Sequence, residues 1–302
     1  MVEVYISIII TAYNRKKFLL EAINSVLNQT LSRNKYEIIL IKNFEDSHID
    51  EIINKNSIKS INMDGTIGMY LLRGLLSAKG NVIVFLDDDD MFFENKLEFV
   101  YNLFKQNEQL VYFHNLPQFI DENNNPINGS GKALSFNISC ISIKKDIVNL
   151  EILNKVSGLT DSFMLYSAFD AGGTIIAGNE ILSYYRLHNS TSNFNGDTDS
   201  KIAFKNNLFQ NFIAQLEIFY NCFNSRKAKR YILNYMITLQ LNVNIFTKLG
   251  YSNIYYHITP SKLIRYLTIF NYWGKRKRYP FKFLKVIEIY LPKNILKKRI
   301  SP

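Results

Sequence analysis

Four consecutive aspartates, Asp87–Asp90, follow the purely apolar run Val82–Leu86. An apolar run of this length is typical of a buried strand. A strand that ends in clustered carboxylates brings negative charge to the edge of a sheet, where the groups repel and raise each other's pKa values. A hard cation with oxygen ligands, Mg²⁺ or Mn²⁺, would relieve that repulsion and bind phosphates in turn. The alternative is a solvated acidic loop.

Length and composition indicate a globular protein. The chain has 302 residues, of which 47% are hydrophobic, which suits one large or two ordinary domains. Cys140 and Cys222 have no metal-type spacing, so we expect a reducing compartment and no disulfide framework. We expect no secretory signal and no spanning helix, because no uncharged apolar stretch reaches the roughly 20 residues needed. The sequence therefore predicts a cytoplasmic protein, peripheral on the inner membrane face.

The net charge of +10 is unevenly distributed along the chain. Residues 201–302 contain 19 lysines and arginines but only two acidic residues, a net charge of +17, which leaves −7 for residues 1–200. Such asymmetry between halves indicates separate domains. A polar stretch at 189–197 precedes the change in sign. We therefore expect a catalytic domain over 1–198 and a basic helical region over 199–302.

Residues 1–198 alternate between strand-like and helix-like hydrophobic patterns. Strands are expected at 5–11, 36–41, 58–61, 81–86, 136–143 and 181–185, and helices at 16–28, 65–78 and 93–105. This alternation predicts an α/β fold, with a mostly parallel sheet between helices. Ligands of such sheets bind beyond the carboxyl ends of the strands, where Thr11–Arg15, Lys42–Asp46 and Asp87–Asp90 would converge.

Several short motifs occur in a fixed order over about residues 4–195. They are Ser7–Arg15 (SIIITAYNR), Gly68, Arg73–Gly74, Ala78–Gly80, Phe85–Asp90 (FLDDDD), Leu159–Phe163 (LTDSF) and Tyr185–Ser192 (YRLHNSTS). Each is weak alone, but the ordered set resembles the family 2 glycosyltransferases. The resemblance implies the GT-A (Rossmann-like) fold, a mixed, mostly parallel sheet with flanking helices, followed here by an α-helical C-terminal region.

The resemblance also implies roles for individual residues. Nucleotide-sugar binding would fall to Thr11, Ala12, Tyr13, Asn14, Arg15, Asn43, Gly68, Arg73, Asp87, Asp88 and Arg186. The divalent cation, Mn²⁺ or Mg²⁺, would be held by Asp89, Asp87 and His188, and would stabilise the departing pyrophosphate. Arg186 is suited to a bidentate phosphate contact.

Asp161 is the candidate general base, because the acceptor hydroxyl must lose a proton as it attacks. By position alone, Asp161 is also an ordinary helix N-cap. A single base with direct displacement implies inversion at the anomeric carbon.

The chain departs from the family pattern near the nucleotide base. Asn43 stands where members usually carry an aspartate that reads the base, and Leu71–Leu72 replaces an Arg-Asn pair. The Asn43 amide both donates and accepts hydrogen bonds, so it remains compatible with uracil. Arg73 is placed either to contact phosphate or to remain solvated. These departures leave the donor open between UDP-linked and GDP-linked sugars.

The C-terminal third is basic and aromatic. Helical patterns are expected at 203–220, 231–246, 263–273 and 281–291, with basic runs at 275–278 and 297–299. Aromatic amphipathic helices flanked by Lys and Arg are typical of interfacial membrane anchors. A solvated helical subdomain, an oligomer contact and nucleic-acid binding are the alternatives. The first 198 residues contain no nucleic-acid motif, so we expect a membrane surface and no nucleic acid.

The sequence therefore predicts an inverting, metal-dependent glycosyltransferase of the hexosyltransferase type. Its acceptor would be a glycan or a lipid-linked saccharide. If the acceptor is instead a polyprenyl phosphate, the attacking oxygen is already ionised and Asp161 is dispensable. A further alternative is a non-catalytic scaffold that binds nucleotide-sugar or membrane without turnover. A nucleotidyltransferase is disfavoured, because the chain has no P-loop and no second carboxylate pair for two metals.

Overall fold

The computed structural model describes residues 5–129, 131–188 and 198–246. The chain divides into two compact units, one of residues 1–194 with 217–231, the other of residues 195–216 with 232–302. The patterns at 263–273 and 281–291 and both basic runs lie outside the described residues. The domain boundary expected near residue 198 stays a prediction.

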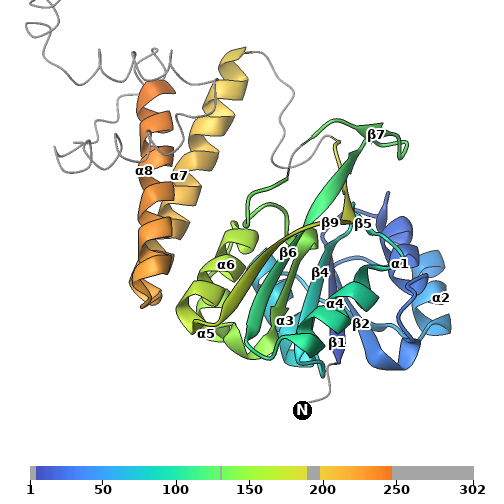
Figure 1. Cartoon of the computed structure of the whole chain (residues 1–302). Helices are drawn as coiled ribbons and strands as arrows, with labels where there is room; N and C mark the ends of the chain where they lie inside the picture. Colours follow the sequence, from blue (N-terminus) through green and yellow to red (C-terminus); the bar gives the residue numbers. More distant parts are fainter. Residues whose placement is uncertain (1–4, 130, 189–197, 247–302) are drawn as a thin grey trace, which may run out of the picture. The chain divides into compact units, whose positions relative to one another are not determined.

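The described residues of the first unit form a nine-stranded mixed sheet in the order β3-β2-β1-β4-β8-β6-β9-β5, with β7 paired to β6 (Figure 1). The strands are β1 Ile6–Ala12, β2 Tyr36–Lys42, β3 Lys59–Asn62, β4 Val82–Asp87, β5 Met91–Phe92, β6 Leu110–Ile120, β7 Pro126–Ile127, β8 Ile141–Lys144 and β9 Thr174–Arg186. The first four sequential strands pair in parallel, whereas β8 runs antiparallel to both β4 and β6.

Strand β1 lies at the centre of the parallel part of the sheet. All of its residues are buried, as expected for a strand covered on both faces. Thr11 pairs with Ile41 of β2 on one side and with Asp87 of β4 on the other. This register brings the carboxyl ends of β1, β2 and β4 to one edge of the sheet.

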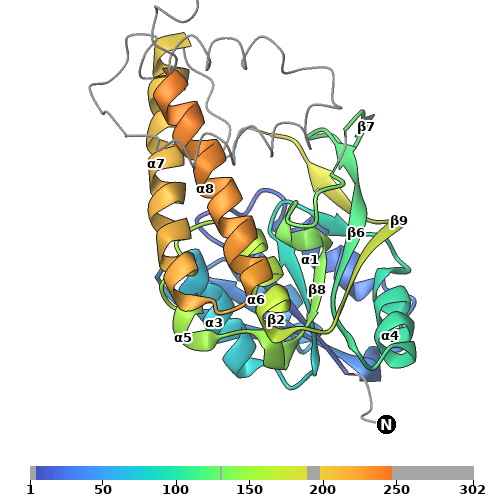
Figure 2. The same cartoon turned by 60° about the vertical axis from the view of Figure 1, so that its left-hand side comes forward.

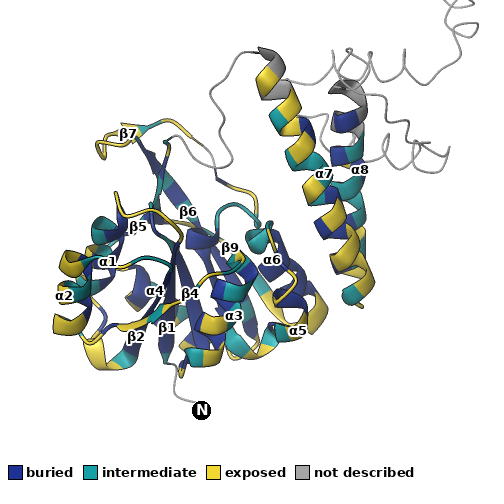
Figure 3. Cartoon of the chain, turned by 180° about the vertical axis from the view of Figure 1, so that it is seen from behind, coloured by how far each residue is buried: buried dark blue, intermediate teal, exposed yellow. Residues whose placement is uncertain are grey.

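Helices flank the sheet, and burial is highest along the strands (Figure 3). They are α1 Leu19–Leu27, α2 Ser47–Lys55, α3 Ile67–Ser77, α4 Lys96–Gln106, α5 Leu150–Leu153 and α6 Thr160–Ala171, with 3-10 turns η1 Arg33–Lys35, η2 Ile138–Cys140 and η3 Lys145–Ile147. One core cluster joins Ile23 of α1 and Leu97 of α4 to Ile8 of β1. Each such fully buried side chain contributes about 1.5–3 kcal/mol relative to exposure.

Two long helices follow, α7 Thr198–Cys222 and α8 Arg226–Phe246, which run side by side (Figure 2). In the first unit, Phe219 and Phe223 pack against Phe163 of α6, with ring centroids 5.4 and 5.6 Å apart. The connection between α7 and α8 is held by Asp170, whose carboxylate accepts the backbone N–H groups of Asn224 and Ser225. Within the described ranges, no helix combines the length and apolarity needed to cross a membrane.

The expected strand over 136–143 is only partly correct. The strand β8 begins at Ile141, because residues 138–140 form the turn η2 and Asn137 has a positive φ of 53°. A residue in that backbone region cannot continue an extended strand. The turn η2 lies beside the end of β4, next to the acidic turn Asp87–Asp90.

Candidate active site

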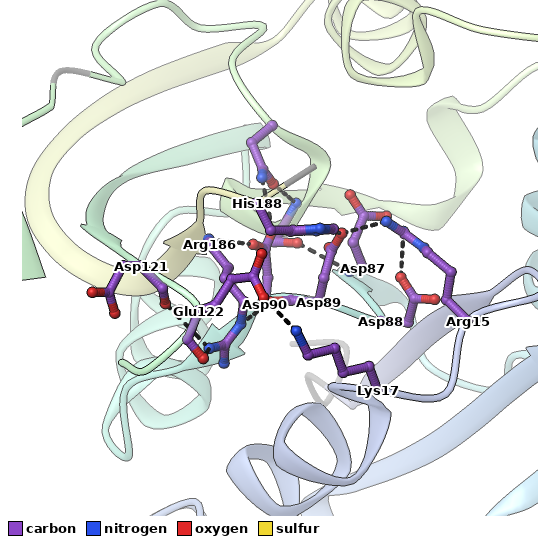
Figure 4. A network of polar contacts seen from close by, with 12 residues as sticks. Arg15, Lys17, Asp87, Asp88, Asp89, Asp90, Asp121, Glu122, Arg186 and His188 are labelled. Carbon is purple, nitrogen blue, oxygen red and sulfur yellow. Dashed lines mark hydrogen bonds and ion pairs between the residues drawn. The ribbon is translucent and has the colours of Figure 1, made fainter. Parts of the chain in front are cut away.

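The acidic turn lies at the carboxyl edge of the sheet (Figure 4). Asp87 is the last residue of β4, and the backbone N–H of Asp90 returns to the carbonyl of Asp87 at 3.3 Å. Asp87, Asp89 and Asp90 each offer a carboxylate oxygen within 4.8 Å of the others. Asp88 and Asp90 are only 2% and 1% exposed. The turn therefore concentrates carboxylates in a largely water-excluded place.

Burial and mutual repulsion make the ionised turn costly. Burial, reinforced by Asp89, raises the pKa of Asp87 well above its ordinary value. Burial also raises the pKa of Asp90 to about 7, and that of Asp88 to about 7 against the opposing effect of Arg15. Oδ2 of Asp88 has no hydrogen-bond partner among the described residues. This all-oxygen, electron-rich set fits a hard divalent cation such as Mg²⁺ or Mn²⁺.

Two basic side chains reach Asp89 from distant parts of the sequence. Arg15 donates from one guanidinium nitrogen to Asp89 at 2.6 Å and from the other to Asp88. Nε2 of His188 lies 2.8 Å from the same oxygen of Asp89. On the strand side, the Thr11 hydroxyl lies 3.5 Å from the Asp87 carboxylate. The structure thus brings together the first motif, the acidic turn and His188.

Arg186 lies behind the acidic turn. Its side chain is fully buried; Nε donates to the carbonyl of Asp89 at 2.9 Å and one terminal nitrogen forms an ion pair with Glu21 at 2.8 Å. The other terminal nitrogen donates to the carbonyls of residues 121–122 at 3.3 Å. The guanidinium therefore ties the turn to α1 and to the loop before β7. Its contact with a donor phosphate stays a prediction.

Asp161, the candidate base, is the second residue of α6. Its carboxylate accepts the backbone N–H of Ser162 at 2.7 Å, and the backbone N–H of Asn137 also lowers its pKa. Burial nevertheless raises its pKa to about 6, because these donors only partly offset desolvation. A carboxylate with that pKa is ionised at neutral pH yet basic enough to accept a proton.

Tyr185 is near enough to the acidic turn and to the candidate base for both to act on its pKa. Its pKa is raised to about 12 by burial and then by the charges of Asp90, Asp89, Asp87 and Asp161. The ring packs edge-on against Phe136 and Phe119, with centroids 5.1 and 5.2 Å away. These aromatic rings form an apolar wall beside the carboxylates.

The residues predicted to contact the nucleotide base lie beyond β1 and β2. Asn14 and Asn43 are paired through two hydrogen bonds of 2.8 and 2.9 Å, and Asn14 has a positive φ of 54°. Tyr13 is 53% exposed, and its ring meets the edge of Tyr70 with centroids 6.0 Å apart. Ala12, the last residue of β1, is buried beneath them. An exposed ring beside paired amides is suited to a planar polar ligand.

Gly68 and Arg73 do not join this cluster. A Cβ on Gly68 would come within 2.3 Å of the Leu153 carbonyl oxygen and 2.4 Å of that of Val156, so this glycine permits close packing of α3 on the α5 segment. Arg73 is exposed in the middle of α3. Their assigned contacts with the donor stay predictions.

A cleft of about 1140 Å³ lies at the opposite edge of the sheet, near the start of β4. Lys79, Lys105, Lys144 and Lys145 are among its lining residues. None of the predicted site residues borders it, and its position at the amino end of β4 places it away from the acidic turn.

Three residues beside the acidic turn and Asp161 were not predicted from the sequence: Glu21, Asn137 and Tyr185. Tyr185 had a signal, because it stands beside Arg186 in a quoted motif. Glu21 and Asn137 had none: their partners are 165 and 47 positions away in the chain. Such contacts follow only from the folded arrangement.

The family model described as Glycosyl transferase family 2 matches residues 7–169. The Minor teichoic acid biosynthesis protein GgaB of Bacillus subtilis (strain 168) is 32% identical over 124 residues, which cover 38% of this chain and 14% of GgaB. The poly(ribitol-phosphate) β-N-acetylglucosaminyltransferase TarP of Staphylococcus aureus (strain N315) is 29% identical over 109 residues, which cover 34% of this chain and 33% of TarP. The chain thus spans less than two thirds of the length of these curated relatives.

A solved structure, that of S. aureus TarS in complex with UDP-GlcNAc, superposes with a TM-score of 0.58. The match covers 82% of this chain and 74% of that chain at 12% identity. At this identity the likeness concerns the fold alone. It confirms the predicted GT-A fold, with its mixed sheet, flanking helices and helical C-terminal region.

Proposed function

This chain belongs to glycosyl transferase family 2, and we propose that it transfers a sugar, with inversion and with a divalent cation, from a UDP-linked donor to a hydroxyl group of a glycan chain. One observation carries the proposal. The acidic turn Asp87–Asp90, the hydrogen-bonded pair Asn14 and Asn43, and the partly exposed Asp161 are all positioned by the carboxyl ends of strands or by segments packed against them.

A uridine nucleotide is favoured over a guanosine nucleotide. The Asn43 amide carries a donor and an acceptor of the kind that pair with uracil, which would exchange its present bonds to Asn14 for bonds to the base; the exposed ring of Tyr13, next to Asn14 in the chain, is available for stacking. The structurally similar TarS was solved with UDP-GlcNAc. GDP-linked sugars remain the second class to test.

Asp87, Asp89 and His188 would hold the cation, with Mn²⁺ or Mg²⁺ as the candidates. Asp90 supports them from behind, because its oxygens already accept the Arg186 backbone N–H at 3.0 Å and the Asn137 amide at 2.7 Å. When bound, the cation supplies electrostatic stabilisation of the departing diphosphate. Arg15, which is 42% exposed, is free to turn its second nitrogen toward a phosphate while it keeps one carboxylate.

Asp161 would accept the proton of the attacking hydroxyl. Its environment raises its pKa to about 6, so that it is a base at neutral pH. Attack from the face opposite the diphosphate inverts the anomeric carbon in one displacement. This role also favours a hydroxyl acceptor over a polyprenyl phosphate, whose oxygen needs no base.

The acceptor class is proposed from the relatives and from charge. GgaB and TarP are named for teichoic acid and poly(ribitol-phosphate) chemistry. An acceptor of that class carries phosphodiester charges, and residues 201–302 carry a net charge of +17.

The same basic region suits peripheral attachment to an anionic membrane on the cytoplasmic side. Co-sedimentation with anionic and zwitterionic vesicles tests that attachment; equal binding to both, or none, contradicts it.

Donor turnover and product stereochemistry test the proposal. Wild type, Asp161→Asn and the control Asp170→Asn are incubated with UDP-sugars, Mn²⁺ and a polyol-phosphate or saccharide acceptor; UDP release gives the rate and proton NMR the anomeric configuration. We expect an inverted product, with the rate lowered about 10²- to 10⁴-fold only in Asp161→Asn. A retained configuration contradicts the mechanism. Full activity of Asp161→Asn with a polyprenyl phosphate as the acceptor would support that alternative, and binding of the UDP-sugar without turnover would support the scaffold.

A further inference from the structure

Asn137 has an unusual backbone conformation directly beside the active site. Its φ is 53° and its ψ is 124°, immediately before the turn η2. A non-glycine residue in such a region costs about 1–3 kcal/mol and persists only where its surroundings over-determine it. The contacts of Asn137 show what holds it there.

The side chain and backbone of Asn137 interact with both the acidic turn and Asp161. Its Nδ2 donates to Oδ2 of Asp90 at 2.7 Å, which is a contact with the acidic turn. Its backbone N–H is near enough to the Asp161 carboxylate to lower the pKa of that group, against the effect of burial. Its Oδ1 accepts the backbone N–H of Ser139 at 2.5 Å, which closes the turn η2 on itself. One residue thus contacts the metal-side carboxylates and the candidate base.

The turn η2 is itself anchored to the acidic turn. The Ser139 hydroxyl accepts the backbone N–H of Asp87 at 3.0 Å and also lowers the pKa of Asp90. The carbonyl of Ser139 accepts from the buried Lys96 ammonium at 2.5 Å, and that ammonium also reaches the hydroxyl of Ser183 on β9 at 2.8 Å. The segment therefore cannot shift without breaking buried polar contacts.

The residues that precede Asn137 are anchored from β6. The Tyr112 hydroxyl donates to the carbonyl of Leu134 at 2.5 Å, and Nε2 of His114 lies 2.8 Å from the carbonyl of Phe136. Both side chains come from one strand of the central sheet. Buried hydrogen bonds therefore hold the segments on both sides of Asn137 in place.

We propose that Asn137 is a positioning residue, which fixes the separation and orientation of Asp161 relative to the acidic turn. The inference rests on the proposed function, since it assigns the base to Asp161 and the cation to the turn. In a one-step displacement these two groups act on opposite faces of the sugar. A misplacement of about 1 Å costs about 10²-fold in rate. We therefore expect a residue that spans both groups to affect the turnover rate more strongly than it affects donor binding.

Three variants test the inference. Asn137→Gly accepts the positive φ without strain but loses both side-chain hydrogen bonds. Asn137→Asp keeps the shape and the cap of η2 but turns an acceptor toward Asp90. Asn149→Gly is the matched control, because Asn149 also caps a helix, accepting the N–H groups of Glu151 and Ile152 at 3.1 Å, and lies away from the acidic turn.

We expect kcat to fall at least about tenfold in both Asn137 variants, with the donor KM within about threefold, as for an interaction that acts in the transition state. Asn149→Gly should retain kcat. Melting curves establish that each variant is folded under assay conditions. A wild-type kcat in Asn137→Gly, or a loss of kcat matched by Asn149→Gly, would overturn the inference.

A double-mutant cycle separates the inference from the proposed function. In the Asp161→Asn background, Asn137→Gly should cost less than about twofold further, because residues that act as a unit are non-additive. Full additivity of the two losses overturns the positioning role. Full activity of Asp161→Asn alone removes the proposed base and the inference with it, whereas an inactive Asp161→Asn beside a fully active Asn137→Gly overturns the inference only.

Discussion

Asp161 carries an electrostatic cost in the folded protein that its substitution by asparagine removes. Burial raises its pKa from 3.8 to about 6. Each pKa unit corresponds to about 1.36 kcal/mol, so ionised Asp161 costs roughly 3 kcal/mol at alkaline pH. Asparagine keeps an oxygen for the N–H groups of Ser162 and Asn137 but buries an amide NH₂, which costs about 1–3 kcal/mol if it finds no acceptor. We expect a net gain of about 1 kcal/mol in the free energy of unfolding.

The sign of the pH dependence follows from the direction of the shift. Because the folded state raises the pKa of an acid, the stability associated with protonated Asp161 is complete below about pH 4 and is lost as the pH rises through about 6. The advantage of Asp161→Asn is therefore greatest above pH 7, vanishes between about pH 5 and pH 6, and turns into a net destabilisation near pH 4 and below, where Asp161 becomes protonated in both states. Activity moves the other way: the wild-type rate falls as the pH drops below about 6, because the base becomes protonated.

Thermal unfolding at pH 5 and pH 8 measures the effect, with Asp170→Asn as the control. Asp170 is exposed at the end of the same helix, and asparagine retains an oxygen for the N–H groups that it caps. A gain of about 1 kcal/mol raises Tm by about 2–4 °C for a domain of this size. We expect that rise for Asp161→Asn at pH 8 only, and none for Asp170→Asn. A lower Tm for Asp161→Asn at pH 8, or an equal rise at both pH values, would show that ionised Asp161 carries no such cost.

Three further perturbations have defined outcomes. Mn²⁺ binding at pH 7 should release protons, because a cation lowers the pKa values of Asp88 and Asp90 from about 7; calorimetry in buffers of different ionisation enthalpy that detects no release contradicts this. Arg186→Lys should lower the free energy of unfolding in urea by about 2 kcal/mol and weaken Mn²⁺ binding, because an ammonium group cannot replace the hydrogen bonds of the planar guanidinium. An unchanged free energy of unfolding and unchanged Mn²⁺ affinity would mean that Arg186 does not hold the acidic turn in place. Gly74→Ala should cost about 1–3 kcal/mol, because its Cβ would lie 2.6 Å from Cγ2 of Ile9; a neutral effect in urea unfolding would mean that α3 shifts freely on β1.

The parts of the site that lie on consecutive residues were predictable. The apolar run before Asp87 predicted a strand that ends at the aspartates, because hydrophobic patterns and turn-forming residues are local features of the sequence. Parallel pairing then required Thr11, Asn43 and Asp87 to meet at one edge, and the register of β1 with β2 and β4 provides this. The alternation of strands and helices was sufficient for the fold class.

The parts that depend on strand β6, on the turn before β8 and on the partners of Arg186 were not predictable. Strand β6 carries the polar residues His114 and Asn115 in its buried interior, and its pairing with β9 has register shifts, so neither a plain apolar run nor a regular alternation marks it. The hydrophobic pattern over 136–143 favoured a strand, and the conformation of Asn137 overrides it. Arg186 was expected at phosphate, but the buried partners that hold it leave no trace in the local sequence.

Titration of UDP into the protein tests the central claim, a cation-dependent nucleotide-sugar site at the acidic turn. Calorimetry is run with Mn²⁺ and with EDTA on wild type, Asp89→Ala and the control Asp146→Ala, an exposed acid in η3 beside the opposite cleft. We expect UDP to bind wild type and Asp146→Ala with Mn²⁺ only, and not to bind folded Asp89→Ala. UDP binding that survives both EDTA and Asp89→Ala would contradict that claim.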